Sequence, residues 1–242
     1  MTHKILPRSS IRVLIVEDHV LFAESLELAL SMEGYDVRRL VLPESGGSMS
    51  TILSAAIRAH PRIVLLDLDL GRFGNGGHLI GPMAGAGVSV VVITASTDRA
   101  RWGECLRYGA RKVMSKTEPL NDILATVRRL NEGLPLMAPD EREELLQLWH
   151  SERRDQQVQR ARLERLTNRE REVLGHLVGG RTVREIAREE VVSEATVRTQ
   201  VKAILSKLEV SSQLAAVGIA HRTRWQPPRA ESSRGQRSRS DQ

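Results

Sequence analysis

Short apolar runs alternate with amphipathic stretches from Ile11 to Glu132. The runs predict buried strands at 11–16 (IRVLIV), 35–41 (YDVRRLV), 63–66 (IVLL), 88–94 (VSVVVIT) and 112–115 (KVMS). Between the first two runs, apolar residues recur at the spacing of one helix face, and further helices are predicted around 52–57, over 98–108 and over 120–130. The glycine-rich stretch 71–87 predicts a loop followed by a short or kinked helix.

This alternation of strands and helices indicates βαβ units, which build a parallel sheet covered by helices on both faces. Five units over residues 11–132 predict a flavodoxin-like, doubly wound α/β domain with a five-stranded parallel sheet.

The pattern changes after residue 132. Two prolines, Pro135 and Pro139, precede a highly charged stretch that predicts a helical linker over 133–165. Residues 166–224 predict a small all-α domain. The composition of residues 1–10 and of the basic tail 225–242 is typical of disorder.

Polar residues occupy the ends of four predicted strands. Glu17 and Asp18 follow the first strand, Asp67 follows the third, Thr94 ends the fourth and Lys116 follows the fifth. Each position alone is unremarkable, because strand ends routinely carry polar residues. The carboxyl ends of parallel strands lie on one edge of a sheet, so we expect the five side chains to meet there.

This set of residue types supports one coherent chemistry. Clustered carboxylates repel one another and require a divalent cation, and oxygen ligands suit Mg²⁺. Asp67 would act as a carboxylate nucleophile that accepts a phosphoryl group, with charge from Lys116 and a hydrogen bond from Thr94. The predicted metal ligands are the side chains of Glu17, Asp18 and Asp67 and the backbone carbonyl of Asp69.

The strings VLIVEDH, IVLLDLDL, VVVITAS and GARKVMSK occur in this order. Across residues 11–132 they resemble the receiver domain of two-component response regulators. The resemblance implies that a partner histidine kinase phosphorylates Asp67, that Glu17 and Asp18 bind Mg²⁺, and that Thr94 and Lys116 contact the phosphoryl group.

The sequence departs from that family at several positions. Leu70 and Gly71 replace the usual Met-Pro, and Asn75 stands where a loop glycine is usual, which indicates one extra loop residue. Val113 replaces the aromatic residue whose movement normally accompanies that of the threonine. The acceptor chemistry is retained, but an alternative follows: a receiver that acts without phosphorylation, through a ligand or through dimerisation.

Three helices are predicted within residues 166–210. Thr167 and Glu170 form a capping box for the first, and Ser193 caps the third. The second and third are joined by a short turn, and the third shows Arg198, Thr199 and Lys202 on its outer face. This describes a helix-turn-helix reader of DNA, although a structural bundle with a charged face fits the periodicity equally well.

The strings LTNREREVL, EIA, S-x-x-T-V-R and KLEV are similar to the LuxR/NarL-type helix-turn-helix domain, from residue 166 to about 222. The resemblance implies that the helix 193–208 enters the major groove. Gln200 replaces a frequent histidine. The DNA contacts implied are Arg198, Thr199 and Lys202, with Thr196 and Lys207 as phosphate contacts.

The last predicted helix, 212–221, carries small residues that permit close helix approach. The resemblance implies that the family dimerises through this element, whereas packing against its own domain is equally open. The dimerisation residues would be Leu214, Ala215, Val217 and Gly218.

Composition narrows the classes of protein further. The net charge of +6 and a pI of about 10.1 favour a polyanionic partner. The single cysteine, Cys105, excludes an internal disulfide. No apolar run approaches the ~18 residues of a membrane span, and the N-terminus lacks an apolar signal core. We therefore expect a cytoplasmic protein with no membrane partner.

These observations predict a non-enzymatic response regulator of the LuxR/NarL family. Its expected partners are double-stranded promoter DNA, a sensor histidine kinase and, in the active state, a second copy of the chain. A less favoured alternative is a haloacid dehalogenase-like phosphatase, because DLDLG contains a D-x-D motif in which Asp69 would be the acid/base.

Overall fold

The structure is a computed structural model that describes residues 7–42 and 47–227. The described residues form two compact units, which divide between Ser151 and Glu152. Among them, no single helix combines the length and hydropathy needed to cross a membrane, although two consecutive helices separated by a 55° bend pass that test jointly.

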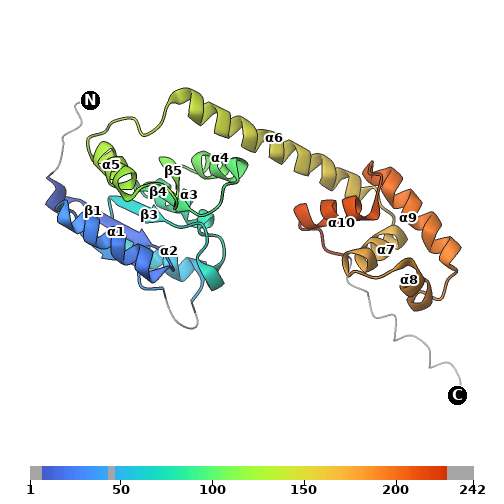
Figure 1. Cartoon of the computed structure of the whole chain (residues 1–242). Helices are drawn as coiled ribbons and strands as arrows, with labels where there is room; N and C mark the ends of the chain where they lie inside the picture. Colours follow the sequence, from blue (N-terminus) through green and yellow to red (C-terminus); the bar gives the residue numbers. More distant parts are fainter. Residues whose placement is uncertain (1–6, 43–46, 228–242) are drawn as a thin grey trace, which may run out of the picture. The chain divides into compact units, whose positions relative to one another are not determined.

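The first unit contains a five-stranded sheet (Figure 1). Its strand order is β2-β1-β3-β4-β5, and all neighbouring pairs are parallel. This confirms the flavodoxin-like α/β fold. The edge strand β2 is shorter than predicted, because pairing with β1 extends from Asp36 to Arg39. The strands are β1 (Arg12–Val16), β2 (Asp36–Arg39), β3 (Ile63–Leu66), β4 (Ser89–Thr94) and β5 (Lys112–Ser115).

Helices cover both faces of the sheet. On one face, α1 (Val20–Met32) and α5 (Leu120–Asn131) pack over strand residues such as Val13 and Ile15. On the other, α2 (Met49–Arg58), α3 (Ile80–Gly85) and α4 (Arg99–Arg107) pack over Leu14 and Val16. Adjacent strand residues therefore enter opposite cores, as the alternating direction of side chains along a strand requires.

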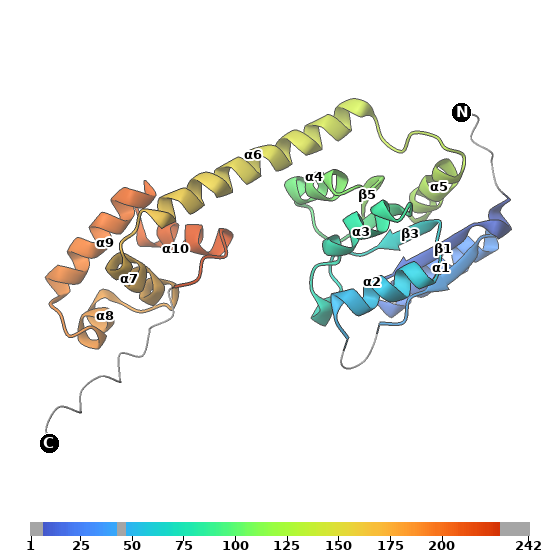
Figure 2. The ribbon, with the colours of Figure 1, turned by 180° about the vertical axis from the view of Figure 1, so that it is seen from behind.

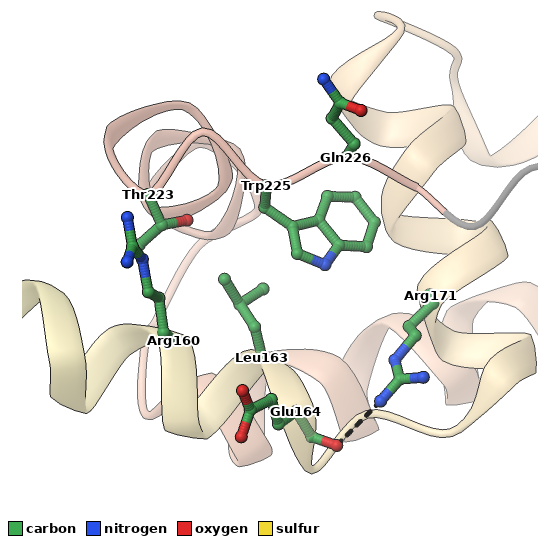
Figure 3. Close-up of a pocket in the computed structure, with 7 residues that line it drawn as sticks. All are labelled: Arg160, Leu163, Glu164, Arg171, Thr223, Trp225 and Gln226. Carbon is green, nitrogen blue, oxygen red and sulfur yellow. Dashed lines mark hydrogen bonds between the residues drawn. The ribbon is translucent and has the colours of Figure 1, made fainter.

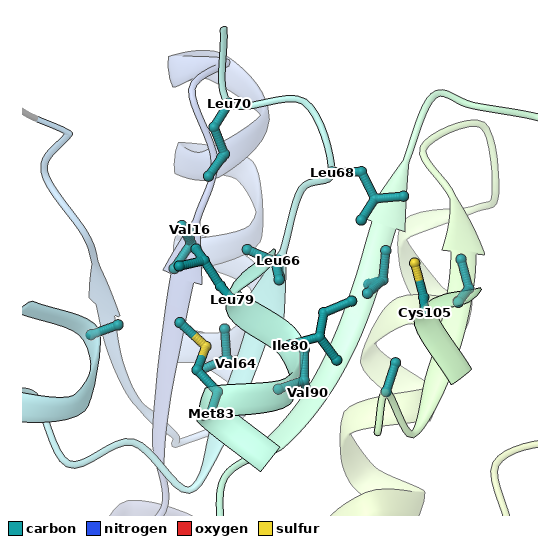
Figure 4. Packing of buried hydrophobic residues seen from close by; sticks show 14 of the residues in the cluster. Val16, Val64, Leu66, Leu68, Leu70, Leu79, Ile80, Met83, Val90 and Cys105 are labelled. Atoms are coloured by element: carbon teal, nitrogen blue, oxygen red, sulfur yellow. The ribbon is translucent and has the colours of Figure 1, made fainter. Parts of the chain in front are cut away.

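The glycine-rich stretch forms short elements, as the sequence predicts. Two 3-10 helices, η2 (Gly71–Phe73) and η3 (Gly76–Leu79), precede α3, which has 6 residues. Leu79, Ile80 and Met83 anchor this region against strand residues of the core (Figure 4).

The second unit consists of helices around a separate apolar core. Both α7 and α8 begin with a complete capping box, Thr167 with Glu170 and Thr182 with Glu185, and Ser193 caps α9. These local signals explain where the helices start. The helices are α7 (Asn168–Val178), α8 (Val183–Glu189), α9 (Glu194–Leu208) and α10 (Gln213–Arg222).

The predicted linker is one helix, α6 (Pro139–Glu164), and it is shared between the two units. Leu145 is 2% exposed in the core of the first unit, and Leu163 is 3% exposed in that of the second. One end of the predicted linker is therefore anchored in the first unit and the other end in the second.

Both predicted disordered ends are ordered over their inner residues. Arg8–Ser10 form the 3-10 helix η1, and Arg8 pairs with Glu33 at 3.3 Å. At the other end, Trp225 packs against the second core, and together with Leu163 it lines a pocket of about 420 Å³ (Figure 3). The disorder predicted for 1–6 and 228–242 concerns residues outside the described part of the chain.

Candidate phosphoryl site and DNA-binding helix

Backbone hydrogen bonds bring the ends of the central strands together. The Asp67 amide donates to the Val16 carbonyl at 3.0 Å, and the Lys116 amide donates to the Thr94 carbonyl at 2.9 Å. The residues just beyond β1, β3, β4 and β5 are thereby held at one edge of the sheet, as the sequence predicts.

Lys116 joins the two most buried carboxylates of this edge. Its Nζ donates to Asp67 Oδ2 at 2.7 Å and to Glu17 Oε1 at 2.8 Å. The side chains of Asp67 and Glu17 are 2% and 3% exposed. An ammonium between two carboxylates offsets part of a charge that is costly to bury.

The environment shifts the pKa of both Glu17 and Lys116. Burial raises the pKa of Glu17, and the hydrogen bond from Lys116 opposes this only in part. Burial acts to lower the pKa of Lys116, but hydrogen bonds to Asp67 and Glu17 outweigh it, so that pKa is raised. Lys116 is therefore a persistent positive charge beside Asp67.

Thr94 lies at the end of β4 and is 2% exposed. Its Oγ1 accepts a hydrogen bond from the Ser96 amide at 3.1 Å. The hydroxyl hydrogen is thus available for a further acceptor, because a hydroxyl both accepts and donates.

Asp69 takes a different position from the other acids. Its amide donates to Asp67 Oδ1 at 3.2 Å, while its own Oδ1 accepts from the Gly71 amide at 3.2 Å. The carboxylate closes its own turn, so the phosphatase reading, which needs it as an acid/base beside Asp67, finds no support in the geometry.

A group of potential ligand atoms surrounds Asp67. One atom each from Glu17, Asp18, His19 and Asp67 lies within 4.8 Å of the others. The carboxylate oxygens are the donors that Mg²⁺ prefers. Three of the four residues were predicted from the sequence.

His19 and Phe22 were not predicted as site residues. His19 Nδ1 lies 3.1 Å from both Glu17 Oε1 and Asp18 Oδ1, and Lys116 Nζ lies 5.4 Å from the centroid of the Phe22 ring. His19 directly follows the acidic pair, which is a usable sequence signal, whereas Phe22 is one of several apolar residues of α1 and carries no such signal.

The loop after Asp67 needs a glycine at position 76. A Cβ there would lie 2.2 Å from the Asp67 carbonyl oxygen, a distance that real contacts essentially never show. Gly76 follows Asn75 directly, which supports the interpretation that the loop carries one extra residue. Asn75 Oδ1 instead accepts from the Gly77 amide and from Arg101 Nη2, each at 3.0 Å.

The outer face of α9 carries the predicted DNA-contacting residues. Arg198, Thr199 and Lys202 are exposed, and the Arg198 side chain, 69% exposed, pairs with Glu194 at 3.2 Å. The inner face is buried through Val197, Val201, Ile204 and Leu208. The helix thus keeps a cationic, hydrogen-bonding face in solvent.

The two predicted phosphate contacts have partners within their own domain. The Thr196 hydroxyl lies 2.8 Å from that of Ser193 at the start of α9. Lys207 Nζ donates to Glu170 Oε2 at 2.6 Å and so ties α9 to α7. A phosphate role for either residue stays a prediction.

In α10 the four predicted dimerisation residues differ in exposure. Leu214 is 82% exposed, whereas Ala215, Val217 and Gly218 are half-buried, and Val217 packs against the core of its own unit. Of the four, Leu214 has the side chain that is most available to a second copy.

Two family profiles match the chain. Residues 13–128 match the profile described as response regulator receiver domain, and residues 164–220 match bacterial regulatory proteins, luxR family.

Relatives of similar length align with most of the chain. A probable transcriptional regulatory protein NarL of Mycobacterium tuberculosis is 29% identical over 216 residues, which cover 88% of this chain and 95% of the relative. A nitrate/nitrite response regulator protein homolog of Haemophilus influenzae is 24% identical over 210 residues, covering 86% and 95%. A promoter-bound structure of RcsB from Salmonella enterica serovar Typhimurium covers 86% of this chain and 97% of its own, at 20% identity and a TM-score of 0.47.

The receiver profile matches the parallel α/β unit, and the luxR profile matches the helical unit that follows it. The chain therefore belongs to the LuxR family of response regulators, which are transcriptional regulators and not enzymes.

Proposed function

We propose that this regulator accepts a phosphoryl group on Asp67 from a sensor histidine kinase, and then binds promoter DNA as a homodimer through α9. The observation that carries the proposal is the position of Lys116, hydrogen-bonded to both Asp67 and Glu17 beside the acid of Asp18. A nucleophilic carboxylate, a fixed cation and a set of metal-ligand oxygens are the groups that phosphoryl transfer requires.

The chemical step transfers the group from the imidazole of a phosphohistidine. A carboxylate oxygen of Asp67 attacks phosphorus, the P–O bond forms, the P–N bond breaks, and the imidazole leaves. The Thr94 hydroxyl then donates to a phosphoryl oxygen, and Lys116 offsets the added negative charge. Bound Mg²⁺, held by Glu17, Asp18, Asp67 and the backbone carbonyl of Asp69, would supply further charge neutralisation.

For DNA recognition, α9 supplies groups of two kinds. Arg198 can pair bidentately with a guanine edge in the major groove. Thr199 and Lys202 contact bases or phosphates next to it, and Thr196 and Lys207 contact phosphates, which position the helix. Leu214 leads the dimer contact of α10, with Ala215, Val217 and Gly218 beside it.

Intact-protein mass spectrometry after incubation with acetyl phosphate and Mg²⁺ tests the acceptor. The expected result is one phosphoryl adduct on the wild type and none on Asp67→Asn. DNA affinity and oligomeric state, measured on the same samples, test the coupling. Equal affinity and the same oligomeric state in wild type and Asp67→Asn under these conditions would show that phosphorylation does not control binding.

A second candidate is a receiver that regulates the same DNA-binding domain without phosphorylation. It is favoured by Val113, which is 4% exposed within an apolar core at the position of the usual aromatic residue. Absence of an adduct in a folded, DNA-binding chain would favour this candidate.

A further inference from the structure

The first half of α6 packs against α4 at a point that has no room for a side chain. A Cβ on Gly103 would lie 2.0 Å from the backbone oxygen of Leu145 and 3.0 Å from Trp149 Cβ. Leu145 itself is 2% exposed and belongs to the receiver core. The approach of the two helices therefore depends on the glycine.

Polar contacts accompany this apolar one. Arg142 of α6 donates through Nη2 to the Leu106 carbonyl at the end of α4, at 3.3 Å. Arg99 and Glu144 form an ion pair at 3.1 Å, but both side chains are largely exposed, and exposed ion pairs contribute little to stability. The packing of Leu145 over Gly103 is the contact that holds α6 on α4.

A short series of hydrogen bonds connects α4 to the phosphoryl site. Thr94 Oγ1 accepts from the Ser96 amide at 3.1 Å, and the Ser96 carbonyl accepts from Trp102 Nε1 at 2.9 Å. The Trp102 ring packs against the core cluster that contains Leu145. Trp102 also directly precedes Gly103, the residue on which Leu145 of α6 packs. The series of contacts from Thr94 therefore reaches α4 next to the point where α6 packs.

Val113 cannot supply such a connection. It is buried among apolar residues and its side chain has no polar atom. Trp102 has a ring that packs on the apolar cluster to which Leu145 also belongs, and an N–H that donates to the Ser96 carbonyl in the loop after Thr94.

We propose that Trp102 couples the phosphoryl site to α6, and that phosphorylation weakens the packing of Leu145 of α6 on Gly103 of α4. The inference rests on the proposed phosphorylation of Asp67. When the Thr94 side chain turns to a phosphoryl oxygen, it withdraws the acceptor from Ser96. The loop then shifts, Trp102 moves with the Ser96 carbonyl, and the packing beneath Leu145 is disturbed. The last turn of α6 is anchored in the core of the DNA-binding domain through Leu163, so a change at the first half of this helix can reach that domain along the helix itself.

Hydrogen–deuterium exchange of residues 139–151 in the full chain measures this directly. In the wild type, treatment with acetyl phosphate and Mg²⁺ should accelerate exchange there on the order of tenfold. Trp102→Phe keeps an aromatic ring at this position but loses the N–H. It should form the same adduct by mass spectrometry yet show no such acceleration. Trp225→Phe, the same change in the other unit, should respond like the wild type.

Gly103→Ala tests the packing of Leu145 on Gly103 independently of phosphorylation. It should raise exchange of residues 139–151 in the untreated chain, because the added methyl group meets backbone. Gly85→Ala is the matched control, since it also places alanine in a receiver helix and a Cβ there meets nothing within 4 Å.

The outcomes separate this inference from the proposed function. If no adduct forms on the wild type, the proposed function fails and the coupling fails with it. The Gly103→Ala result still decides whether α6 packs on Gly103. If the adduct forms but exchange of 139–151 does not change, or if Trp102→Phe responds like the wild type, the coupling through Trp102 is overturned and the proposed function stands.

Discussion

Lys116 and Asp67 are hydrogen-bonded at 2.7 Å although 49 residues separate them along the chain. The contact exists because β3 and β5 both flank β4, so the residues that follow them end at the same edge. Lys116 also donates a hydrogen bond to Glu17, so removal of the lysine leaves two buried carboxylates without this counter-charge.

The first prediction concerns this counter-charge. Lys116→Met should destabilise the receiver by about 3 kcal/mol, because a buried ion pair that loses one partner leaves an uncompensated charge. Urea unfolding, followed by Trp102 and Trp149 fluorescence in a Trp225→Phe background, measures it. Adding Asp67→Asn to Lys116→Met should restore part of the loss. Equal stability of Lys116→Met and its parent would show that the ammonium does not stabilise the fold.

A second prediction concerns the turn between α8 and α9. Val191 adopts a left-handed conformation, φ 54°, and is 90% exposed. A β-branched residue is strained there and has little packing to lose, so Val191→Gly should stabilise the DNA-binding domain by about 1 kcal/mol. That corresponds to a rise in Tm of roughly 4–8 °C.

Thermal unfolding followed by Trp225 fluorescence, with Trp102 and Trp149 replaced by Phe, measures this change. Val191→Ala should gain less than Val191→Gly, because alanine retains the Cβ that causes the strain. A lower Tm for Val191→Gly would refute the assignment of strain to this turn.

The third prediction is a pH dependence at the junction of α7 and α9. Burial acts to raise the pKa of Glu170, but hydrogen bonds from Lys207 and Thr167 outweigh it, so the pKa lies below its ordinary value of 4.5. A carboxyl whose pKa is lower in the folded than in the unfolded chain stabilises the fold at pH values above its unfolded-state pKa. This contribution is lost as the pH falls through the folded-state pKa.

The urea midpoint of the DNA-binding domain should therefore fall as the pH drops below about 4.5. In Glu170→Gln the fall should be smaller, and what remains comes from groups such as Glu190, whose pKa is also lowered. Identical pH profiles for Glu170→Gln and its parent would exclude Glu170 as a source of the acid lability.

A fourth prediction concerns Cys105. Burial raises the pKa of its thiol to about 12, and the side chain lies in the receiver core. The reactive thiolate is therefore scarce at pH 8, on the order of one molecule in ten thousand, so iodoacetamide should not label the native chain. Mass spectrometry should show one adduct in urea and none without it. Rapid labelling of the native chain would mean that the α4 region opens readily.

The fifth prediction separates two kinds of contact on α9. Against a duplex that the wild type selects from random-sequence DNA, Arg198→Ala should lose about 1–3 kcal/mol of binding free energy and discriminate less at one base position. Lys202→Ala should weaken binding to all sequences alike and reduce the salt slope by about 1. Fluorescence anisotropy over a salt series measures both.

Arg58→Ala, an exposed receiver arginine, provides the control for a lost positive charge. It should leave both affinity and salt slope unchanged. If Arg198→Ala weakened all sequences equally, Arg198 would be a phosphate contact and not a base contact.

Local pattern was sufficient for most of the fold. The five apolar runs became five parallel strands, and the capping residues Thr167 and Ser193 mark the helix starts that the sequence predicts. Because polar residues at strand ends meet at one edge of a parallel sheet, the meeting of Glu17, Asp67 and Lys116 was also readable in advance.

Tertiary contacts added what composition did not reveal. The charged stretch 133–165 predicts a helical linker, and the structure shows that Leu145 of this helix is buried in the first core and Leu163 in the second. Few apolar residues are enough to dock a helix when each is fully buried, and periodicity over a charged stretch does not reveal them.

The sequence by itself determined the order of the elements and the residue types that gather around Asp67, because both depend on residue type and spacing. The tertiary structure alone decided that Lys207 pairs with Glu170 and that Leu145 of α6 packs on Gly103. It also decided that Trp102 donates to the Ser96 carbonyl while its ring packs on the apolar cluster that includes Leu145. The contacts of Lys207 with Glu170 and of Leu145 with Gly103 join segments distant in the chain, and such contacts depend on how folded elements pack rather than on any local pattern.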